Sequence, residues 1–261
     1  MKNLLKLELR GLKKKKSFYI CMGIMVAMLL LTTLMNKLLM DMTAEFAPGL
    51  ELSPELSPDF AMTGMDTLIS TMNNSSFTLV IGIFVSIFVC EDYAYKIVKN
   101  IFSRGYTRRQ VYMAKLVSSL ISATVMFLVV ELAGFAIGAA FFGWKAPADL
   151  SFLGVLGTQY VIVMGFVCLS FLIASVIRRN GGAIATIVVV PTVIDLVLTL
   201  IDLFGGNGSS DFANGWLSTM LLDASVLSVS ADRLLACLGI SLAYILVFAG
   251  TGYFLSNKND L

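Results

Sequence analysis

Long apolar stretches alternate with short polar ones along the chain, and six of the apolar stretches are long enough to cross a bilayer. A membrane-spanning helix needs about 20 predominantly apolar residues. The cores of four stretches contain no charged residue, and the other two are each interrupted by one acid, Glu131 or Asp195. The pattern predicts an all-α membrane protein with six transmembrane helices at about 17–39, 72–91, 115–143, 151–177, 181–204 and 233–256.

Basic residues predict the orientation of these spans, because Lys and Arg near span ends stay on the cytoplasmic side. With the N-terminus inside, sixteen of the nineteen basic residues are cytoplasmic, and eleven of the seventeen acids lie outside. The cytoplasmic basic residues are seven before the first span, six from Lys96 to Lys115, Arg178, Arg179 and Lys258. We therefore predict cytoplasmic termini, a cytoplasmic segment at 91–114, and external segments at 40–71 and 205–232.

Composition excludes several classes of function. Apolar residues make up 57% of the 261 and charged residues only 14%, against about 45–50% and 25% in soluble domains. The chain has no histidine, which excludes an imidazole base, a Ser-His-Asp triad and a His-ligated metal. The four cysteines have no paired spacing, so we expect neither a disulfide framework nor a metal site. An intramembrane enzyme is poorly supported, because no span carries paired carboxylates.

The seven N-terminal basic residues have two interpretations. They are either only a topology anchor or one side of an amphipathic helix over residues 2–13 that lies in the plane of the lipid headgroups. The second interpretation rests on Leu5, Leu9 and Leu12, which recur at helical spacing, with basic residues toward the other side. Glu8 interrupts the apolar face.

The segment from Glu91 to Lys115 joins the second and third spans and has the pattern of two short helices. Residues 91–104 contain neither Gly nor Pro and place Ile101 on one face with other apolar residues, which favours a helix. Gly105 is suited to the left-handed conformation that ends such a helix. Thr107 and Gln110 have the spacing of a capping box, which starts the next one. The alternative is a basic cytoplasmic loop that happens to be helical and has no role beyond fixing the orientation of the spans.

Six spans, a basic amphipathic lead-in and this segment resemble the ABC-2 type permeases, the transmembrane subunits of bacterial ATP-binding-cassette exporters. The sequence similarity is concentrated in Glu-Asp-Tyr at 91–93, followed by Lys-x-x-Lys-Asn-x-x-Ser-x-Gly-Tyr-x-Arg-x-x-x-Tyr-x-x-Lys to Lys115. More narrowly, the chain resembles lantibiotic and peptide export or immunity permeases of Gram-positive bacteria. The resemblance implies one permease domain over 1–261 and a multi-pass protein of the bacterial plasma membrane.

The resemblance also implies partners and a contact surface. The segment after the second span would be the coupling helix that docks on an ATPase, and residues 2–13 would be the connecting helix. Two ATPase copies would bind ATP and Mg²⁺, and a second permease chain, identical or related, would complete the complex. The residues that we expect to contact the ATPase are Glu91, Tyr95, Lys96, Lys99, Asn100, Arg104 and Tyr106.

The chain has no P-loop of its own, since no Gly-Lys dipeptide occurs in it and the motif requires one. It is therefore not a P-loop ATPase, and an ATP-driven process needs a separate polypeptide. We expect no cofactor on this chain and no nucleic-acid partner.

Four residues of the apolar stretches are candidates for the substrate path or for a dimer interface: Glu131, Gly134, Gly138 and Asp195. A carboxylate within a span costs about 3 kcal/mol on insertion scales, so it usually faces a cavity or a partner. The alternative for Glu131 is a structural, hydrogen-bonded side chain. The spacing of Gly134 and Gly138 allows close helix approach, either between chains or within one.

The predicted function is the permease subunit of an exporter whose substrate is a peptide such as a bacteriocin. Residues 41–66 carry six acids and no base, which suits an external vestibule for cationic peptides, although acids also accumulate wherever basic residues are excluded. The alternative function is an ATP-independent secondary transporter or channel. Those folds often carry internal repeats and several intramembrane charges, whereas this sequence has no evident repeat and two intramembrane acids.

Overall fold

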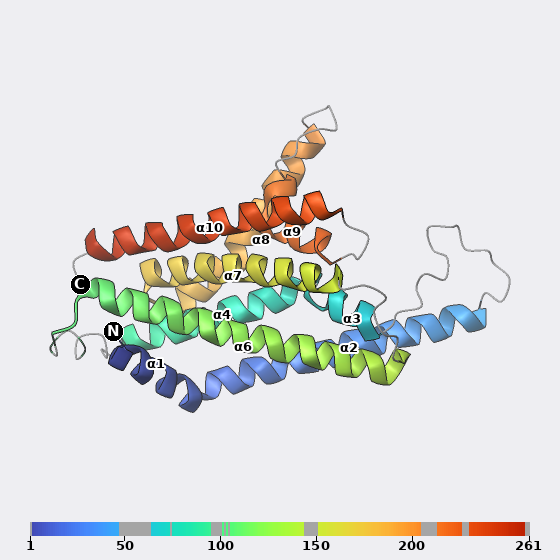
Figure 1. The fold of residues 1–261 in the computed structure, drawn as a ribbon, viewed down its shortest axis with the longest axis horizontal. Helices are drawn as coiled ribbons and strands as arrows, with labels where there is room; N and C mark the ends of the chain where they lie inside the picture. Colours follow the sequence, from blue (N-terminus) through green and yellow to red (C-terminus); the bar gives the residue numbers. More distant parts are fainter. Residues whose placement is uncertain are drawn as a thin grey trace.

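A computed structural model describes residues 2–46, 64–73, 75–94, 101, 103, 105–143, 151–204, 213–225 and 230–258, and these ranges contain helices and no strand (Figure 1). The long elements are α2 (Lys16–Phe46), α4 (Ser75–Ala94), α6 (Arg108–Phe142), α7 (Ser151–Ile177), α8 (Asn180–Phe204) and α10 (Ala231–Lys258). The short elements are α1 (Lys2–Lys14), α3 (Gly64–Ser70), η2 (Thr71–Asn73), η3 (Ala213–Gly215) and α9 (Leu217–Asp223).

Six of the described helices are long and apolar enough to cross a membrane, which confirms the fold class predicted from hydropathy. They are α2, α4, α6, α7, α8 and α10. Two of them run beyond the predicted spans by seven residues, whereas the ends of the others differ by at most three. The helix α2 continues to Phe46, because residues 40–46 contain no Gly or Pro to end it, and α6 begins at Arg108, where the predicted capping box lies.

The capping box at the start of α6 is confirmed. The backbone N–H of Gln110 donates to Thr107 Oγ1, and the N–H of Thr107 donates to Gln110 Oε1 at 3.2 Å. The preceding Gly105 has φ +83°, the left-handed conformation expected from its sequence position. This turn sets the point at which the chain enters α6.

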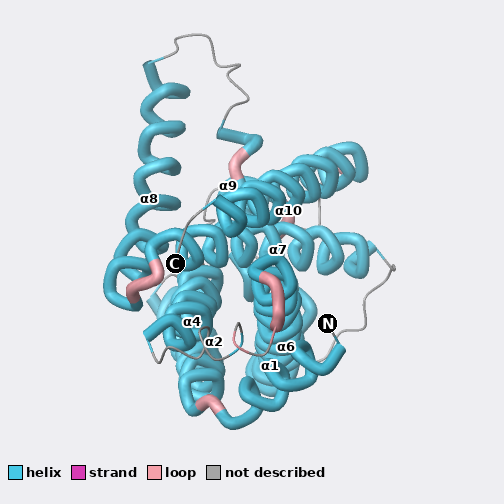
Figure 2. The backbone as a smooth tube through the Cα atoms, turned by 90° about the vertical axis from the view of Figure 1, so that its left-hand side faces the viewer, coloured by secondary structure: helices cyan, strands magenta, loops and turns pink. Residues whose placement is uncertain are grey.

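The helix α7 lies at the centre of the bundle and packs against α4, α6, α8 and α10 (Figures 1 and 2). It contributes Ile162, Val163, Val167 and Phe171, each at most 1% exposed, to a core that also contains Phe84 of α4. Such burial on several faces is expected of a helix that is apolar all round. All four cysteines are buried as well, as small apolar side chains.

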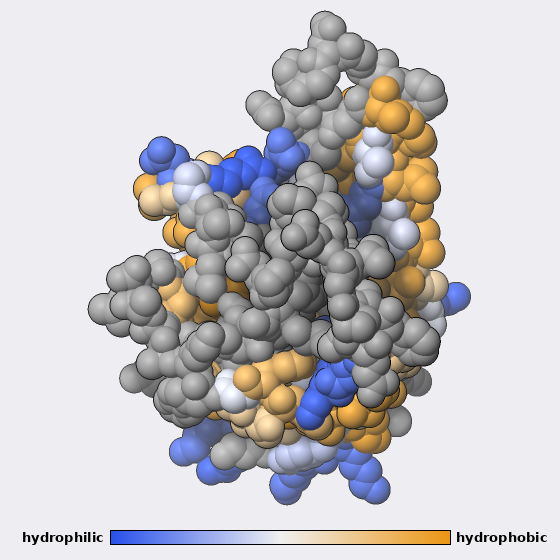
Figure 3. Space-filling view, turned by 90° about the vertical axis from the view of Figure 1, so that its right-hand side faces the viewer, coloured by the Kyte–Doolittle hydropathy of each residue, from blue (hydrophilic) through white to orange (hydrophobic). Residues whose placement is uncertain are grey.

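The helix α8 diverges from the bundle. Its first half packs on α4 and α7 through Ala183 and Ile187, both at most 2% exposed. Its second half stands away from the other long helices in two perpendicular views (Figures 1 and 2). Leu196 and Leu203 of this half are 59% and 72% exposed, and apolar residues colour this part of the surface in Figure 3. Within a membrane, this half of α8 faces lipid or another chain.

The helix α1 packs against the first turns of α6, at the end of the bundle where α4 ends and the N-terminus lies (Figure 1). It is separated from α2 only by Lys15, which is not helical. The predicted helix over residues 2–13 is present, but the face that it buries is formed by Leu4, Glu8 and Leu12, whereas Leu5 and Leu9 are half-buried. Glu8 therefore lies at the centre of the buried face.

Candidate functional site

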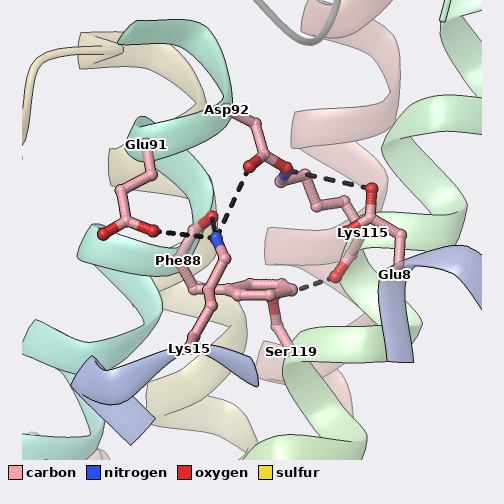
Figure 4. A network of polar contacts seen from close by, with 7 residues as sticks. All are labelled: Glu8, Lys15, Phe88, Glu91, Asp92, Lys115 and Ser119. Carbon is pink, nitrogen blue, oxygen red and sulfur yellow. Dashed lines mark hydrogen bonds and ion pairs between the residues drawn. The ribbon is translucent and has the colours of Figure 1, made fainter. Parts of the chain in front are cut away.

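Charged side chains from three parts of the chain meet at this end of the bundle. Glu8 comes from α1, Lys15 from the break between α1 and α2, Glu91 and Asp92 from the last turn of α4, and Lys115 from the third turn of α6 (Figure 4). We call these five residues the charge cluster. It joins residues that are up to 107 positions apart in the sequence, from Glu8 to Lys115.

Lys115 is the inner cation of the charge cluster. Its ammonium forms an ion pair with Asp92 and lies 4.0 Å from Glu8 Oε1. These three residues are only 4%, 6% and 7% exposed. Taking a charge out of water costs several kcal/mol unless opposite charges and hydrogen bonds compensate for it. Lys115 therefore holds α1 and the end of α4 against α6. Removing one charge of this group would leave another charge buried without a partner, which is destabilising.

Lys15 is the outer cation and holds the end of α4 from the other side. Its Nζ lies 2.9 Å from Glu91 Oε2 and 3.5 Å from Asp92 Oδ1, and it donates to the Phe88 carbonyl at 3.4 Å. It is half-buried, so solvent screens these contacts more than those of Lys115. The last turn of α4 is thus bound by one cation from the break between α1 and α2 and one from α6.

The Phe88 ring lies close to both cations. Lys15 Nζ is 4.5 Å from its centroid and Lys115 Nζ is 5.3 Å from it, within the range of cation–π attraction. The ring adds cation–π contacts to the ion pairs that the two cations form with the three carboxylates. Ser119, one turn after Lys115, donates to the Lys115 carbonyl at 2.9 Å.

A small apolar cluster lies beside the charge cluster and attaches the segment after α4 to the same elements. It consists of Leu4 of α1, Ile101 of the segment, and Val111 and Ala114 of α6, with Tyr106 packed against it. Ile101 is 7% exposed, in keeping with the apolar face predicted for this segment. Glu91 and Asp92 are therefore held by Lys15 and Lys115, and Ile101 is held by apolar packing against α1 and α6.

Two of the seven residues expected to contact an ATPase fall within the described residues. Glu91 is half-buried in the charge cluster, and Tyr106 is half-buried against the small apolar cluster. The other five, Tyr95, Lys96, Lys99, Asn100 and Arg104, lie outside the described residues. The contact surface stays a prediction. Of the two residues that can be placed, Glu91 lies in the last turn of α4 and Tyr106 lies just before α6.

Sequence reasoning missed the pairing of Glu8, Asp92 and Lys115, although each carried a signal. Glu8 is the one acid in the basic lead-in, and Lys115 is a cation at the edge of an apolar span. An isolated charge of each sign in apolar surroundings calls for a partner of opposite sign. Interpreting Glu8 as an interruption of an apolar face overlooked that requirement.

Glu131, Gly134 and Gly138 are all buried along α6. Neither carboxyl oxygen of Glu131 has a hydrogen-bond partner among the described residues. Gly134 lies against Thr71 of η2 and Leu29 of α2, and a Cβ added to it would overlap Thr71 Oγ1. The close approach at Gly134 is thus made within the chain.

Asp195 lies apart from the other three, on the half of α8 that leaves the bundle. Its Oδ2 accepts a hydrogen bond from Ser218 Oγ of α9 at 3.2 Å, and the side chain is half-buried. The structure does not bring Asp195 into one site with Glu131. The predicted substrate path or dimer interface therefore remains a prediction for four residues in two places.

The charge cluster holds helices together and has no features of a catalytic or metal site among the described residues. The described residues contain no group of three or more His, Cys, Asp and Glu side chains placed to hold a metal ion, and Glu91 and Asp92 are already paired with lysines. Ion pairs of this kind fix one element to another and do not require a substrate. The arrangement fixes the last turn of α4 to α6 and to the break between α1 and α2.

Comparison with known proteins points to a family. A family model described as ABC-2 family transporter protein matches residues 4–202, from the first buried residue of α1 to the last turns of α8. All five residues of the charge cluster lie inside the match. A search of curated proteins gave no match.

Proposed function

The chain belongs to the ABC-2 transporter family, and from this premise we propose that it works as the permease subunit of a peptide exporter. Family membership makes it a multi-pass membrane protein without an ATPase site of its own, partnered by an ATP-binding-cassette ATPase. The missing Gly-Lys dipeptide supports the same division of labour. The substrate, the copy numbers and the surface that couples the two proteins belong to the proposal.

The proposed orientation places both termini and the charge cluster in the cytoplasm of a bacterial cell. It is supported by the sixteen of nineteen basic residues that this orientation gathers on one side. All five residues of the charge cluster lie in or next to the stretches 2–16 and 96–115, which are rich in these basic residues. The ATPase would then meet the chain at residues 91–114, next to the charge cluster.

The observation that carries the proposed mechanism is the attachment of α4 to the α1–α2 junction through Lys15 and to α6 through Lys115. Closure of two ATPase subunits on ATP would displace the segment after α4. Because Asp92 and Ile101 are bound to α1 and α6, the displacement would reach α2 and α6 as a rigid-body movement. A loop without such anchors would absorb the displacement in its own backbone.

Charge reversal in the segment tests this mechanism. The double variant Lys99→Glu, Arg104→Glu should insert normally and lose the ATP hydrolysis that depends on the permease by at least about tenfold, because it places like charges across a subunit contact. The readout is vanadate-sensitive ATP hydrolysis by the complex in liposomes. The control is Lys37→Glu, Lys145→Glu, which makes the same charge change on the proposed outer side. Equal hydrolysis in both doubles would refute the contact.

A peptide substrate is proposed because of the acids on the proposed outer side, where residues 41–66 carry six and no base. The complex is proposed to contain two ATPase copies and two permease chains, identical or related. Gly134 is covered by Thr71 and Leu29 of the same chain. The second half of α8, which carries Asp195 and stands away from the bundle, is therefore the better candidate for a contact with a second permease chain. The second candidate function, an ATP-independent transporter or channel, would need no ATPase for solute movement.

A further inference from the structure

The helix α1 has two faces of different chemistry. Leu4, Glu8 and Leu12, spaced at i, i+4 and i+8, are buried against the bundle at 3%, 7% and 6% exposure. The opposite face carries Lys6, Arg10 and Lys14, at the same spacing, and all three are exposed. One face of this 13-residue helix therefore holds the charge cluster, and the other presents a row of cations.

The row of cations has no counter-charge in the described part of the chain. Lys6, Arg10 and Lys14, and Lys16 at the start of α2, form no ion pair with a described carboxylate, although Lys15 between them forms two. Four cations over eleven residues repel one another unless anions lie beside them. We call these four residues the outer basic row.

The position of the outer basic row identifies the kind of anion. Lys16 begins α2, and the exposed side chains that follow within two turns are Tyr19, Ile20 and Ile24, which are 54%, 59% and 46% exposed. In a chain of this family these apolar side chains face lipid hydrocarbon. The outer basic row thus lies where hydrocarbon gives way to headgroups, with Leu7, 50% exposed, beside it.

We propose that the outer basic row binds the headgroups of anionic phospholipids. Charge complementarity, exposure and position at the hydrocarbon boundary all favour lipid over a protein partner on this face. Each Lys or Arg near an anionic membrane surface strengthens binding by about fivefold. Four such side chains together distinguish an anionic lipid from a zwitterionic one.

Lipid on the outer face and the charge cluster on the inner face act on the same helix. Glu8 lies between Leu4 and Leu12 and points to Lys115, so a shift of α1 toward the headgroups changes the distance from Glu8 to Lys115. Since Lys115 also holds Asp92, anionic lipid would set the position from which the segment after α4 moves. This consequence rests on the proposed function, whereas the binding of lipid does not.

Lipid binding is tested on the permease alone. The purified chain is titrated with phosphatidylglycerol or phosphatidylcholine, and bound lipid is counted by native mass spectrometry. We expect tighter binding of phosphatidylglycerol, a loss of about fivefold in Arg10→Gln, and a larger loss in the quadruple variant Lys6→Gln, Arg10→Gln, Lys14→Gln, Lys16→Gln. The matched control is Arg10→Lys, which keeps the positive charge and should bind like the unchanged protein.

Three results would overturn the proposal. They are equal binding of the two lipids, equal binding by Arg10→Gln and Arg10→Lys, and displacement of bound phosphatidylglycerol when the ATPase is added, which would make the outer basic row a protein contact. Exposed cations that merely keep the chain soluble would give the second result.

The consequence for coupling has a separate readout. ATP hydrolysis by the complex should be higher in bilayers that contain phosphatidylglycerol than in pure phosphatidylcholine, and Glu8→Gln should remove the difference. Selective lipid binding with unchanged hydrolysis would refute the link through Glu8. Absence of hydrolysis by the complex in every lipid would count against the proposed function, and the binding result would stand by itself.

Discussion

Removing the charge of Lys115 should destabilise the protein more than removing that of Asp92. Lys115→Met leaves Asp92 and Glu8, 6% and 7% exposed, without a buried cation, whereas Asp92→Asn leaves Lys115 with Glu8 at 4.0 Å. Breaking a buried pair by removing one partner costs about 3–5 kcal/mol. We expect Lys115→Met at the upper end of that range and Asp92→Asn at least about 1 kcal/mol below it.

The double variant Asp92→Asn, Lys115→Met should cost much less than the sum of the two single variants, because it removes both charges of the pair together. The control is Asp223→Asn, which breaks the ion pair with Arg233 near the opposite end of the bundle. Those side chains are 34% and 31% exposed, so the expected loss is only about 0.2–1 kcal/mol.

The buried cysteines provide the assay. Cys21, Cys90, Cys168 and Cys237 are all buried, so a thiol-reactive fluorophore reports unfolding in detergent as the chain is heated. Lys115→Met should lower the midpoint by about 10 °C relative to the unchanged protein. A midpoint within about 2 °C of the Asp223→Asn control, or additive losses in the double variant, would refute the assignment of the charge cluster as a buried ionic anchor.

Three further predictions use the same thermal assay. Gly134→Ala should cost about 1–3 kcal/mol because its Cβ overlaps Thr71 Oγ1; Thr71→Ala should restore most of the loss, and Gly154→Ala, with open space around it, should cost little. Thr107→Ala should cost about 1 kcal/mol through the lost N-cap, and no loss would contradict the importance of the capping box. Glu131→Gln should cost less than about 1 kcal/mol, because the carboxyl has no partner to lose among the described residues; a larger loss would reveal a partner.

The parts of the fold that the sequence predicts correctly depend on local chemistry. Six spans follow from apolar length alone, and the start of α6 follows from Thr107 and Gln110, whose side chains act on backbone groups three residues away. The left-handed Gly105 belongs to the same class. Each of these features is decided by residues that are neighbours in the sequence.

The charge cluster could not be predicted in the same way, because its members come from three separate parts of the chain, at residues 8–15, 91–92 and 115. Whether Glu8 points to water or to Lys115 depends on how α1 packs against α6, and the periodicity of α1 allowed two neighbouring buried faces. The face with Leu5, Leu9 and Leu12 is more apolar, but the buried face is the one with Leu4, Glu8 and Leu12, where Glu8 lies 4.0 Å from Lys115 and both leucines join apolar clusters. Tertiary contacts of this kind are not visible in the periodicity of α1.

The hydropathy pattern also does not predict that the second half of α8 leaves the bundle. Its apolar residues satisfy the length criterion as well as those of α7 do, and nothing local distinguishes a central helix from a peripheral one. The difference is one of packing, because α7 packs against α4, α6, α8 and α10, whereas the second half of α8 stands away from the other long helices (Figures 1 and 2). Its surroundings are supplied by the membrane or by a second chain.

The central claim is that a separate ATPase drives this chain, and its most direct test is the co-expressed complex. The tagged permease is purified together with an ATP-binding-cassette ATPase encoded beside it and reconstituted in liposomes. The account predicts that the two co-purify and that vanadate-sensitive ATP hydrolysis requires both. A permease that purifies without the ATPase and moves solute down an ion gradient without ATP would contradict the claim and favour a secondary transporter or channel.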